Sequence, residues 1–147
     1  MADAEYPLVG YHFFVEVSGK LMGAFREATG LTSESEKIEY KASGPKGEEI
    51  MISQPGRTKY PDIVLKRGMT SNLDMWSWRK DIEDGKFKDS KKNGSIVLYA
   101  QDHSEIARWN FEGAWPTKVE GPGLNSSNNE ITVESLTLAV MKTTRVK

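Results

Sequence analysis

The heptapeptide Tyr11-His12-Phe13-Phe14-Val15-Glu16-Val17 decides the fold class. Apolar residues occupy every second position in it, which is the period of a strand with one buried face. After a break at residues 18–20, residues 21–27 return as a second strand, so the chain begins with a β-hairpin. The same signals predict further strands at 34–41, 62–67, 95–101, 107–115 and 130–142. The sequence therefore predicts a mainly β protein.

The strand predicted at residues 34–41 has one charged face. Ile38 and Tyr40 share one side of it, and the other side carries charges of alternating sign at Lys37, Glu39 and Lys41. Such a face is either exposed to bulk solvent or forms the wall of a water-filled channel, because both environments favour polar side chains at every second position.

Residues 42–60 contain Gly44-Pro45, Gly47 and Pro55-Gly56, and they predict a long loop. Compact domains seldom keep so long a loop without a function for it. The loop also contains the apolar triplet Ile50-Met51-Ile52, which would be poorly placed in free solvent. We therefore expect a neighbouring molecule to order this loop.

One helix is predicted over residues 72–84, with Ser71 as its N-cap and Gly85 just beyond its end. Its apolar residues form two stripes, one of Met75, Trp78 and Ile82 and one of Leu73 and Trp76. A helix on the surface of a monomer needs only one such stripe. The second stripe is therefore buried either inside the fold or against another subunit.

The C-terminal half predicts a basic turn at residues 86–92 and a tight turn at Asn93-Gly94. The last strand, residues 130–142, is longer than most strands. Its apolar side changes near Glu134-Ser135, which predicts a β-bulge. A strand of this length leaves a long edge that needs a partner, so Leu136 and Leu138 become candidates for contact with a neighbour.

Composition argues against several classes of function. The 147 residues are enough for one domain with a core, and 20 basic against 21 acidic residues give a net charge of -1. A nucleic-acid-binding protein is typically strongly basic. The chain has no cysteine, and its N-terminal residues 1–7 lack the apolar segment of a signal peptide. No stretch predicts a membrane-spanning helix, so no direct membrane anchor is expected.

The search for catalytic motifs also gives a negative prediction. His12 and His103 are the only histidines, and neither has a companion at metal-ligand spacing. Asp102, His103 and Ser104 are adjacent in sequence, and adjacent residues cannot form a Ser-His-Asp relay. The sequence therefore predicts no enzyme activity, no catalytic residue, no metal and no cofactor.

A series of landmarks in a fixed order resembles the tail tube (inner tube) proteins of contractile phages, R-type pyocins and extracellular contractile injection systems. The haemolysin-coregulated protein of type VI secretion is related to that family. The landmarks cover most of the chain: residues 11–17, 25–31, 38–41, 54–56, 63–68, the helix with Leu73 and Trp76, 109–118 and 128–138.

The resemblance implies one tail-tube domain over residues 1–147, a two-sheet β-barrel with one flanking α-helix. An N-terminal arm at 1–10 and an extended inter-subunit loop at 42–60 would belong to it. Subunits would form hexameric rings that stack into a hollow tube. The expected contact residues are Ile50, Met51, Ile52, Pro55, Leu73, Trp76, Leu136 and Leu138, and the expected lumen-facing residues are Lys37, Glu39 and Lys41.

The same resemblance implies the partners. They are other copies of the chain, contractile sheath subunits, baseplate or spike and terminator proteins, and a cargo effector or phage DNA in the lumen. Sheath contraction would drive the tube through a target envelope. The tube would assemble in the bacterial cytoplasm and belong to a phage tail or to an extracellular or membrane-anchored injection particle. The alternative is a free hexameric ring that carries or chaperones effectors, as in type VI-like secretion.

Overall fold

The computed structural model describes residues 12–124, 126–127 and 132–147. The predicted arm at 1–10 and the first residue of the opening heptapeptide lie outside these ranges. The elements in order are β1 (His12–Val17), β2 (Lys20–Phe25), β3 (Glu27–Thr29), β4 (Glu34–Ser43), β5 (Glu49–Lys59), β6 (Ile63–Gly68), α1 (Asp74–Glu83), α2 (Phe87–Ser90), β7 (Lys92–Tyr99), β8 (Glu105–Glu120), β9 (Val133–Ala139) and β10 (Lys142–Arg145).

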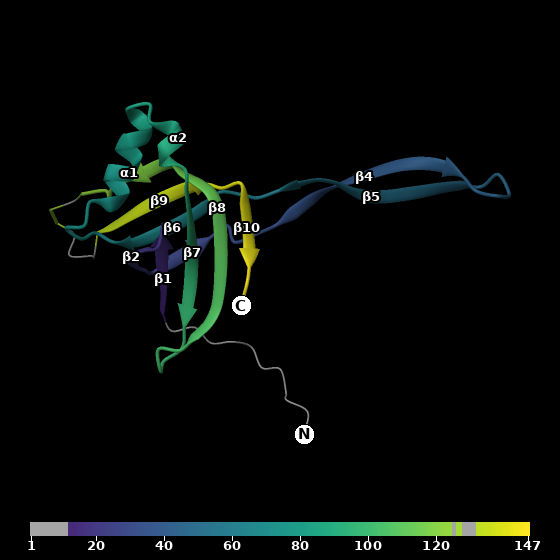
Figure 1. The fold of residues 1–147 in the computed structure, drawn as a ribbon. Helices are drawn as coiled ribbons and strands as arrows, with labels where there is room; N and C mark the ends of the chain where they lie inside the picture. The colour runs from purple at the N-terminus through teal and green to yellow at the C-terminus, as the bar shows by residue number, and fades with distance from the viewer. Residues whose placement is uncertain (1–11, 125, 128–131) are drawn as a thin grey trace, which may run out of the picture.

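Most of the strands form one antiparallel sheet in the order β2-β1-β7-β8-β9-β6-β3, and β10 pairs with β8. The long strand β8 joins the two halves of this sheet. Its first part pairs with β7 and β10, and its last part pairs with β9. The sheet bends along β8, so that the two halves lie at an angle to each other (Figure 1). The prediction of a mainly β protein is confirmed.

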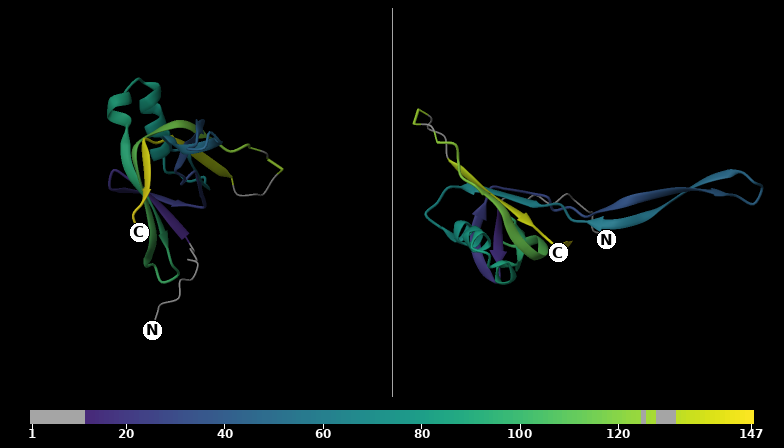
Figure 2. Two further views of the ribbon diagram at one scale, coloured as in Figure 1. Left: turned by 90° about the vertical axis from the view of Figure 1, so that its right-hand side faces the viewer. Right: turned by 90° about the horizontal axis from the view of Figure 1, so that it is seen from above.

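The core lies in the bend between the two halves of the sheet. Alternate residues of β1 enter it, so that Val15 and Val17 are buried as the opening heptapeptide predicted. Helix α1 contributes Met75 and Trp78 and covers part of β8. Full burial of one aliphatic side chain, such as that of Val15, stabilises the fold by roughly 2 kcal/mol. Figure 2 shows α1 and α2 together on one side of the sheet.

The expected two-sheet barrel is not closed within the described part of the chain. Strands β2 and β3 end the hydrogen-bonded path without pairing with each other. The sequence predicted one strand over residues 21–27, whereas the chain leaves β2 at Phe25 and enters β3 in the other half of the sheet. The backbone amide of Arg26 donates to the carbonyl of Lys66 in β6 (2.9 Å) at this crossing.

Helix α1 begins two residues later than predicted. The side chain of Asn72, not that of Ser71, accepts a hydrogen bond at this end, from the backbone amide of Asp74 (2.8 Å). An asparagine before the first turn satisfies an amide that the helix itself leaves unpaired. The end of the helix agrees with the prediction, because Gly85 takes the left-handed conformation with φ 81 that favours glycine.

Residues 86–92 and Asn93-Gly94 do not form the predicted turns. The first segment contains α2, and both Asn93 and Gly94 lie inside β7. Gly94 stands opposite Phe111, whose ring would collide with a side chain at this position. The Asn93 side chain accepts a hydrogen bond from the amide of Gly113 (3.0 Å). Both residues therefore serve cross-strand packing instead of a turn.

The end predicted for β8 at Pro116 is also wrong. The strand continues to Glu120, and its pairing with β9 shifts register between Pro116 and Lys118. A register shift accommodates a proline because the missing amide then interrupts no regular ladder bond. This continuation is what allows one strand to serve both halves of the sheet.

The predicted long C-terminal strand is two strands, β9 and β10, which pair with different parts of β8. No bulge lies at Glu134-Ser135. Glu134, Leu136 and Leu138 all point to the same buried face. The apparent change of face in the sequence arose because a charged residue, Glu134, occupies a core position.

Gly30 gives a first prediction, because its φ is 89 and a side chain there would overlap the backbone of Asp62. We expect Gly30→Ala to lower the free energy of unfolding by about 2 kcal/mol or more, since the left-handed conformation alone costs about 1–2 kcal/mol for alanine. Urea denaturation measures this loss. Gly85→Ala is the matched control: Gly85, in the body of the molecule, also has positive φ, 81, but has open space around it. Equal losses in both variants would contradict the steric explanation.

Candidate assembly surface

The region predicted as a long loop is instead an extended two-stranded arm. Among the described residues, strands β4 and β5 pair only with each other, and residues 44–48 connect them. The arm, residues 34–59, projects far from the body of the molecule (Figures 1 and 2). Its glycines and prolines have separate roles. Gly44 donates its amide to the carbonyl of Glu48 in the turn (2.7 Å), and Pro55 lies next to a register shift.

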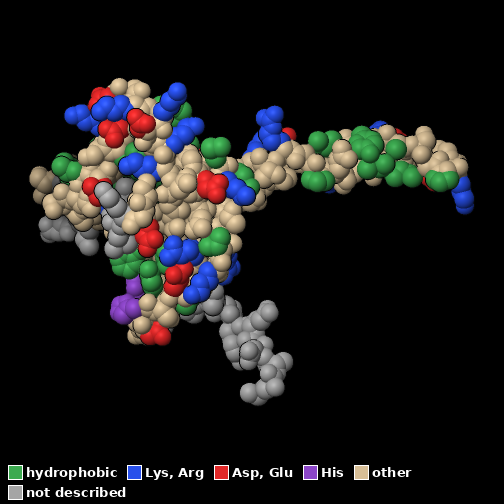
Figure 3. Space-filling model, viewed as in Figure 1, with side chains coloured by type: hydrophobic (Ala, Val, Ile, Leu, Met, Phe, Trp, Pro, Cys, Tyr) green, Lys and Arg blue, Asp and Glu red, His purple; other side chains and the backbone are tan. Residues whose placement is uncertain are grey.

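One face of the arm is largely apolar and exposed. In the β4–β5 register Tyr40 stands opposite Ile52, Ala42 opposite Ile50, and Ile38 opposite Gln54. Opposite residues of an antiparallel pair point to the same side. We call this surface the apolar arm face and define it as Ile38, Tyr40, Ala42, Ile50 and Ile52. Tyr40 is 47% exposed and Ile38 44% exposed. Figure 3 shows hydrophobic side chains along the outer part of the arm.

The other face of the arm is charged. Lys37 binds Glu39 (2.8 Å) and Lys41 binds Glu49 (3.1 Å) on this side. The three residues predicted to face a lumen therefore do share one surface. Met51 and Pro55 lie on the same surface, opposite Lys41 and Lys37. The apolar triplet at 50–52 is thus divided between the two faces, with Met51 alone on the charged one.

At the base of the arm, the ammonium group of Lys59 lies 2.5 Å from the carboxylate of Glu36. This hydrogen bond, together with the attraction between the charges, raises the pKa of Lys59. The pair is exposed, so it contributes little stability in water. An isolated two-stranded hairpin is marginal in water, and the arm pairs with no other strand of the described chain. We therefore expect a partner to hold the arm.

A second exposed apolar surface surrounds the beginning of α1. Of the two predicted helix stripes, Met75 and Trp78 are buried in the core, whereas Leu73 is 66% and Trp76 38% exposed. The second stripe is therefore not buried inside the fold. A further exposed side chain, Met69, lies in the segment that leads from β6 into α1. We call the set of Met69, Leu73 and Trp76 the helix patch.

Trp76 is held in place by a buried ion pair. Glu134 accepts a hydrogen bond from the indole nitrogen of Trp76 with one oxygen (3.1 Å) and one from Nε of Arg67 with the other (2.9 Å). Arg67 also donates to the backbone carbonyl of Asn72 (3.3 Å), and its guanidinium lies over the ring of Phe25. This network connects α1 to both β6 and β9.

Leu136 and Leu138 differ from the other predicted contact residues. Both are fully buried in the core of the chain itself. The sequence predicted that these two side chains contact a neighbouring subunit. Neither of them is exposed, so neither can make that contact. Their alternation with polar residues indicated a buried face correctly, but a sequence pattern does not distinguish an internal face from an intermolecular one.

The adjacent residues 102–104 do not form a relay. The hydroxyl of Ser104 donates to the Asp102 carboxylate (2.6 Å), as does its backbone amide (3.1 Å). These bonds lower the pKa of Asp102. The ring of His103 instead lies against that of His12, with 5.3 Å between ring centres. In the described residues, no group of three His, Cys, Asp or Glu is placed to hold a metal ion.

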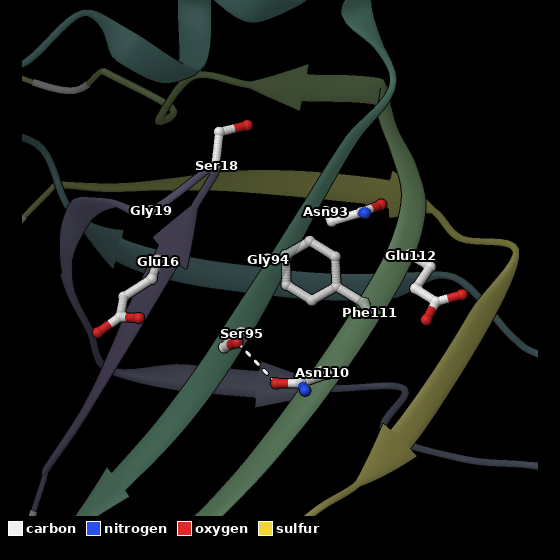
Figure 4. Close-up of a pocket in the computed structure, with 9 residues that line it drawn as sticks. All are labelled: Glu16, Ser18, Gly19, Asn93, Gly94, Ser95, Asn110, Phe111 and Glu112. Carbon is white, nitrogen blue, oxygen red and sulfur yellow. Dashed lines mark hydrogen bonds between the residues drawn. The ribbon is translucent and has the colours of Figure 1, made fainter.

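A polar hollow lies over β1, β7 and β8 (Figure 4). Its floor is structural: Ser95 donates to the side chain of Asn110 (2.7 Å) across the two strands. The carboxylates of Glu16 and Glu112 come from β1 and β8 and lie on opposite sides of the hollow, with β7 between them. Arg108 lies 3.5 Å from Glu16. The hollow therefore has no closely paired carboxylates for acid-base chemistry.

The sequence analysis missed several residues of these surfaces. Tyr40 and Ile38 were placed on one face of a strand but not named as contacts. Residues 37–42 alternate strictly between charged and apolar side chains, residues 49–53 alternate in the same way except at Met51, and the turn residues Gly44 to Gly47 lie midway between them. This symmetry is the signal that could have revealed the arm. Met69 carries no sequence signal, because isolated apolar residues in connecting segments are common.

Comparison with known proteins gives a consistent result. The model of the T4-like virus tail tube protein gp19 family matches residues 9–144. No significant match was found among curated proteins. Among the described residues, no helix has the length and apolar character needed to cross a membrane.

Several solved structures resemble the chain. A structure of the anti-feeding prophage cap (AFP tube terminating cap) has a TM-score of 0.81 and 26% identity, covering 100% of this chain and 95% of that one. The PVC sheath-tube complex of an extracellular contractile injection system gives 0.76 and 24%, covering 97% and 93%. Hcp1 from Flavobacterium johnsoniae gives 0.56 and 14%, covering 92% and 94%. The last two likenesses establish the fold alone.

Proposed function

The chain belongs to the family of the T4-like virus tail tube protein gp19 and is a tail tube protein, and we propose that it assembles into hexameric rings that stack into a hollow tube. The arm carries this proposal. It extends an exposed apolar face away from the body, where the described chain offers it no partner. A monomer would gain nothing from such an element, whereas a neighbouring subunit would bury it.

Ring closure would also satisfy the open edges of the bent sheet. Strand β2 ends the hydrogen-bonded path on one side, and within the part of the chain that the structure describes β10 pairs with β8 alone. Exposed edges favour further strand pairing. Joining the edge of one copy to that of the next would complete a continuous barrel around the ring, which no single copy closes.

The two faces of the arm have different roles in this assembly. The apolar arm face contacts a neighbouring subunit through Ile50 and Ile52, and the helix patch contacts a neighbour through Leu73 and Trp76. The charged face, with Lys37, Glu39 and Lys41, is turned toward water and is the proposed lumen-facing surface of the arm. Met51 and Pro55 lie on the charged face, away from this contact.

The proposed partners follow from the particles in which the similar structures occur. These include a sheath-tube complex, a sheath/tube terminator, a baseplate and a tube cap. We propose that this chain likewise contacts sheath, baseplate and terminator proteins and that the tube conducts a cargo. The chain acts as a structural element and not as an enzyme. The tube assembles in the cytoplasm, as part of a phage tail or a contractile injection particle.

Electron microscopy tests the proposal directly. Negative-stain images of the purified protein at high concentration, or assembled on its baseplate components, are expected to show rings with a central hole that stack into tubes of uniform width. Class averages along the tube axis should have six-fold symmetry. A monodisperse monomer under both conditions would refute the proposal.

A further inference from the structure

The two exposed apolar surfaces lie at opposite ends of the molecule. The tip of the arm projects to one side, and α1 with the 121–124 segment lies on the other side of the body, in two views (Figures 1 and 2). The apolar arm face and the helix patch of one copy are therefore separated by the body and cannot meet within a single chain. Two different patches on opposite sides are suited to head-to-tail contact between copies.

The helix patch is a rigid surface. The indole of Trp76 is fixed by its hydrogen bond to Glu134 (3.1 Å), and the backbone at Gly121 lies against its ring. Arg67 fixes the turn before α1 through the carbonyl of Asn72. Ordering such side chains before binding lowers the entropy cost of association. Tryptophan and tyrosine are also the residue types that contribute most to protein interfaces, and the two surfaces supply one of each.

The length of the arm suits this contact. Its strands span about 35 Å at the usual rise per residue. A compact domain of this size has a radius of gyration of about 15 Å. The arm of one copy is therefore about as long as the body of the next copy is wide. The ion pairs on the charged face keep the side of the arm that does not dock in contact with water.

We propose that the apolar arm face of one copy docks on the helix patch of a neighbouring copy. Each subunit then gives an arm to one neighbour and receives an arm from another. This inference rests on the proposed function, because it assigns the docking site of the arm within the assembled tube. It also gives the Arg67–Glu134 pair a positioning role, since the pair holds Trp76 in the orientation that receives the arm.

The absence of cysteine in the chain allows a clean test by disulfide cross-linking. Leu73→Cys and Met69→Cys proteins are each mixed with single-cysteine arm variants, assembled into tubes and oxidised. The arm variants on the apolar face are Ile38→Cys, Tyr40→Cys and Ile52→Cys, and those on the charged face are Lys41→Cys and Met51→Cys. A disulfide forms only where the two Cβ atoms approach to about 4 Å.

We expect disulfide dimers for at least one pair that combines the helix patch with the apolar arm face, in several-fold excess over every pair with the charged face. Tubes that form without any such dimer would overturn the docking site and leave the proposed function intact. A wild-type protein that forms no tubes would overturn the proposed function and the docking site together.

A charge substitution gives a second test that does not depend on cysteine geometry. Leu73→Asp is expected to abolish tubes, with a circular dichroism spectrum like that of the wild type because the side chain is exposed. Lys88→Asp, on α2 outside the helix patch, is the control and should assemble normally. Wild-type tube formation by Leu73→Asp would also overturn the docking site.

Discussion

Glu134→Ala is expected to destabilise the fold by about 3–5 kcal/mol, because it breaks the buried ion pair between Arg67 and Glu134. Both side chains are nearly inaccessible, at 4% and 1% exposure. The removed carboxylate also accepts the hydrogen bond of Trp76. For a chain of this size the loss corresponds to a fall in Tm on the order of 10 °C. Differential scanning calorimetry measures it.

The control for this prediction replaces both charges. The double variant Arg67→Met with Glu134→Leu removes the ion pair without leaving a buried charge, and buried pairs replaced in this way are often neutral or more stable. We expect the double variant to be at least about 2 kcal/mol more stable than Glu134→Ala. If it is no more stable, the cost of Glu134→Ala does not come from breaking this buried ion pair.

Ile52→Asp is expected to prevent tube assembly without unfolding the body. Ile52 lies on the apolar arm face opposite Tyr40, and the arm pairs with no other strand of the described chain. A carboxylate placed in an apolar interface must lose its hydration, which costs several kcal/mol unless it gains a partner. We expect Ile52→Asp to lower the yield of tubes by at least about tenfold, since about 1.4 kcal/mol per contact already changes association by that factor.

The neighbouring residue supplies the matched control. Met51→Asp places the same charge one position away, on the charged face beside Lys41. We expect this variant to assemble much better than Ile52→Asp, and both to have the melting temperature of the wild-type body. The measurement is the pelleted fraction after ultracentrifugation, checked by electron microscopy. Equal defects in the two variants would contradict the division of the arm into two faces.

The sequence determined the fold class, the central strands and the family. The period-2 alternation in residues 12–17 and 63–67 correctly predicts which side chains are buried, because one face of each strand packs against the core. The landmarks that resemble tail tube proteins agree with the family match over residues 9–144. The sequence also placed Leu73 and Trp76 on a second helix stripe, and both are exposed in the structure.

Only the tertiary structure decided how the arm and the ion pair are built. Glycine and proline in 44–56 are typical of a loop, and cross-strand pairing between β4 and β5 overrides that local preference. Glu134 looked like a surface residue because its partner, Arg67, is distant in sequence. The exposed alternation of the arm and the buried alternation of Leu136 and Leu138 have the same period. Packing in three dimensions distinguishes them, because it alone determines which faces the chain covers by itself and which remain for a neighbour.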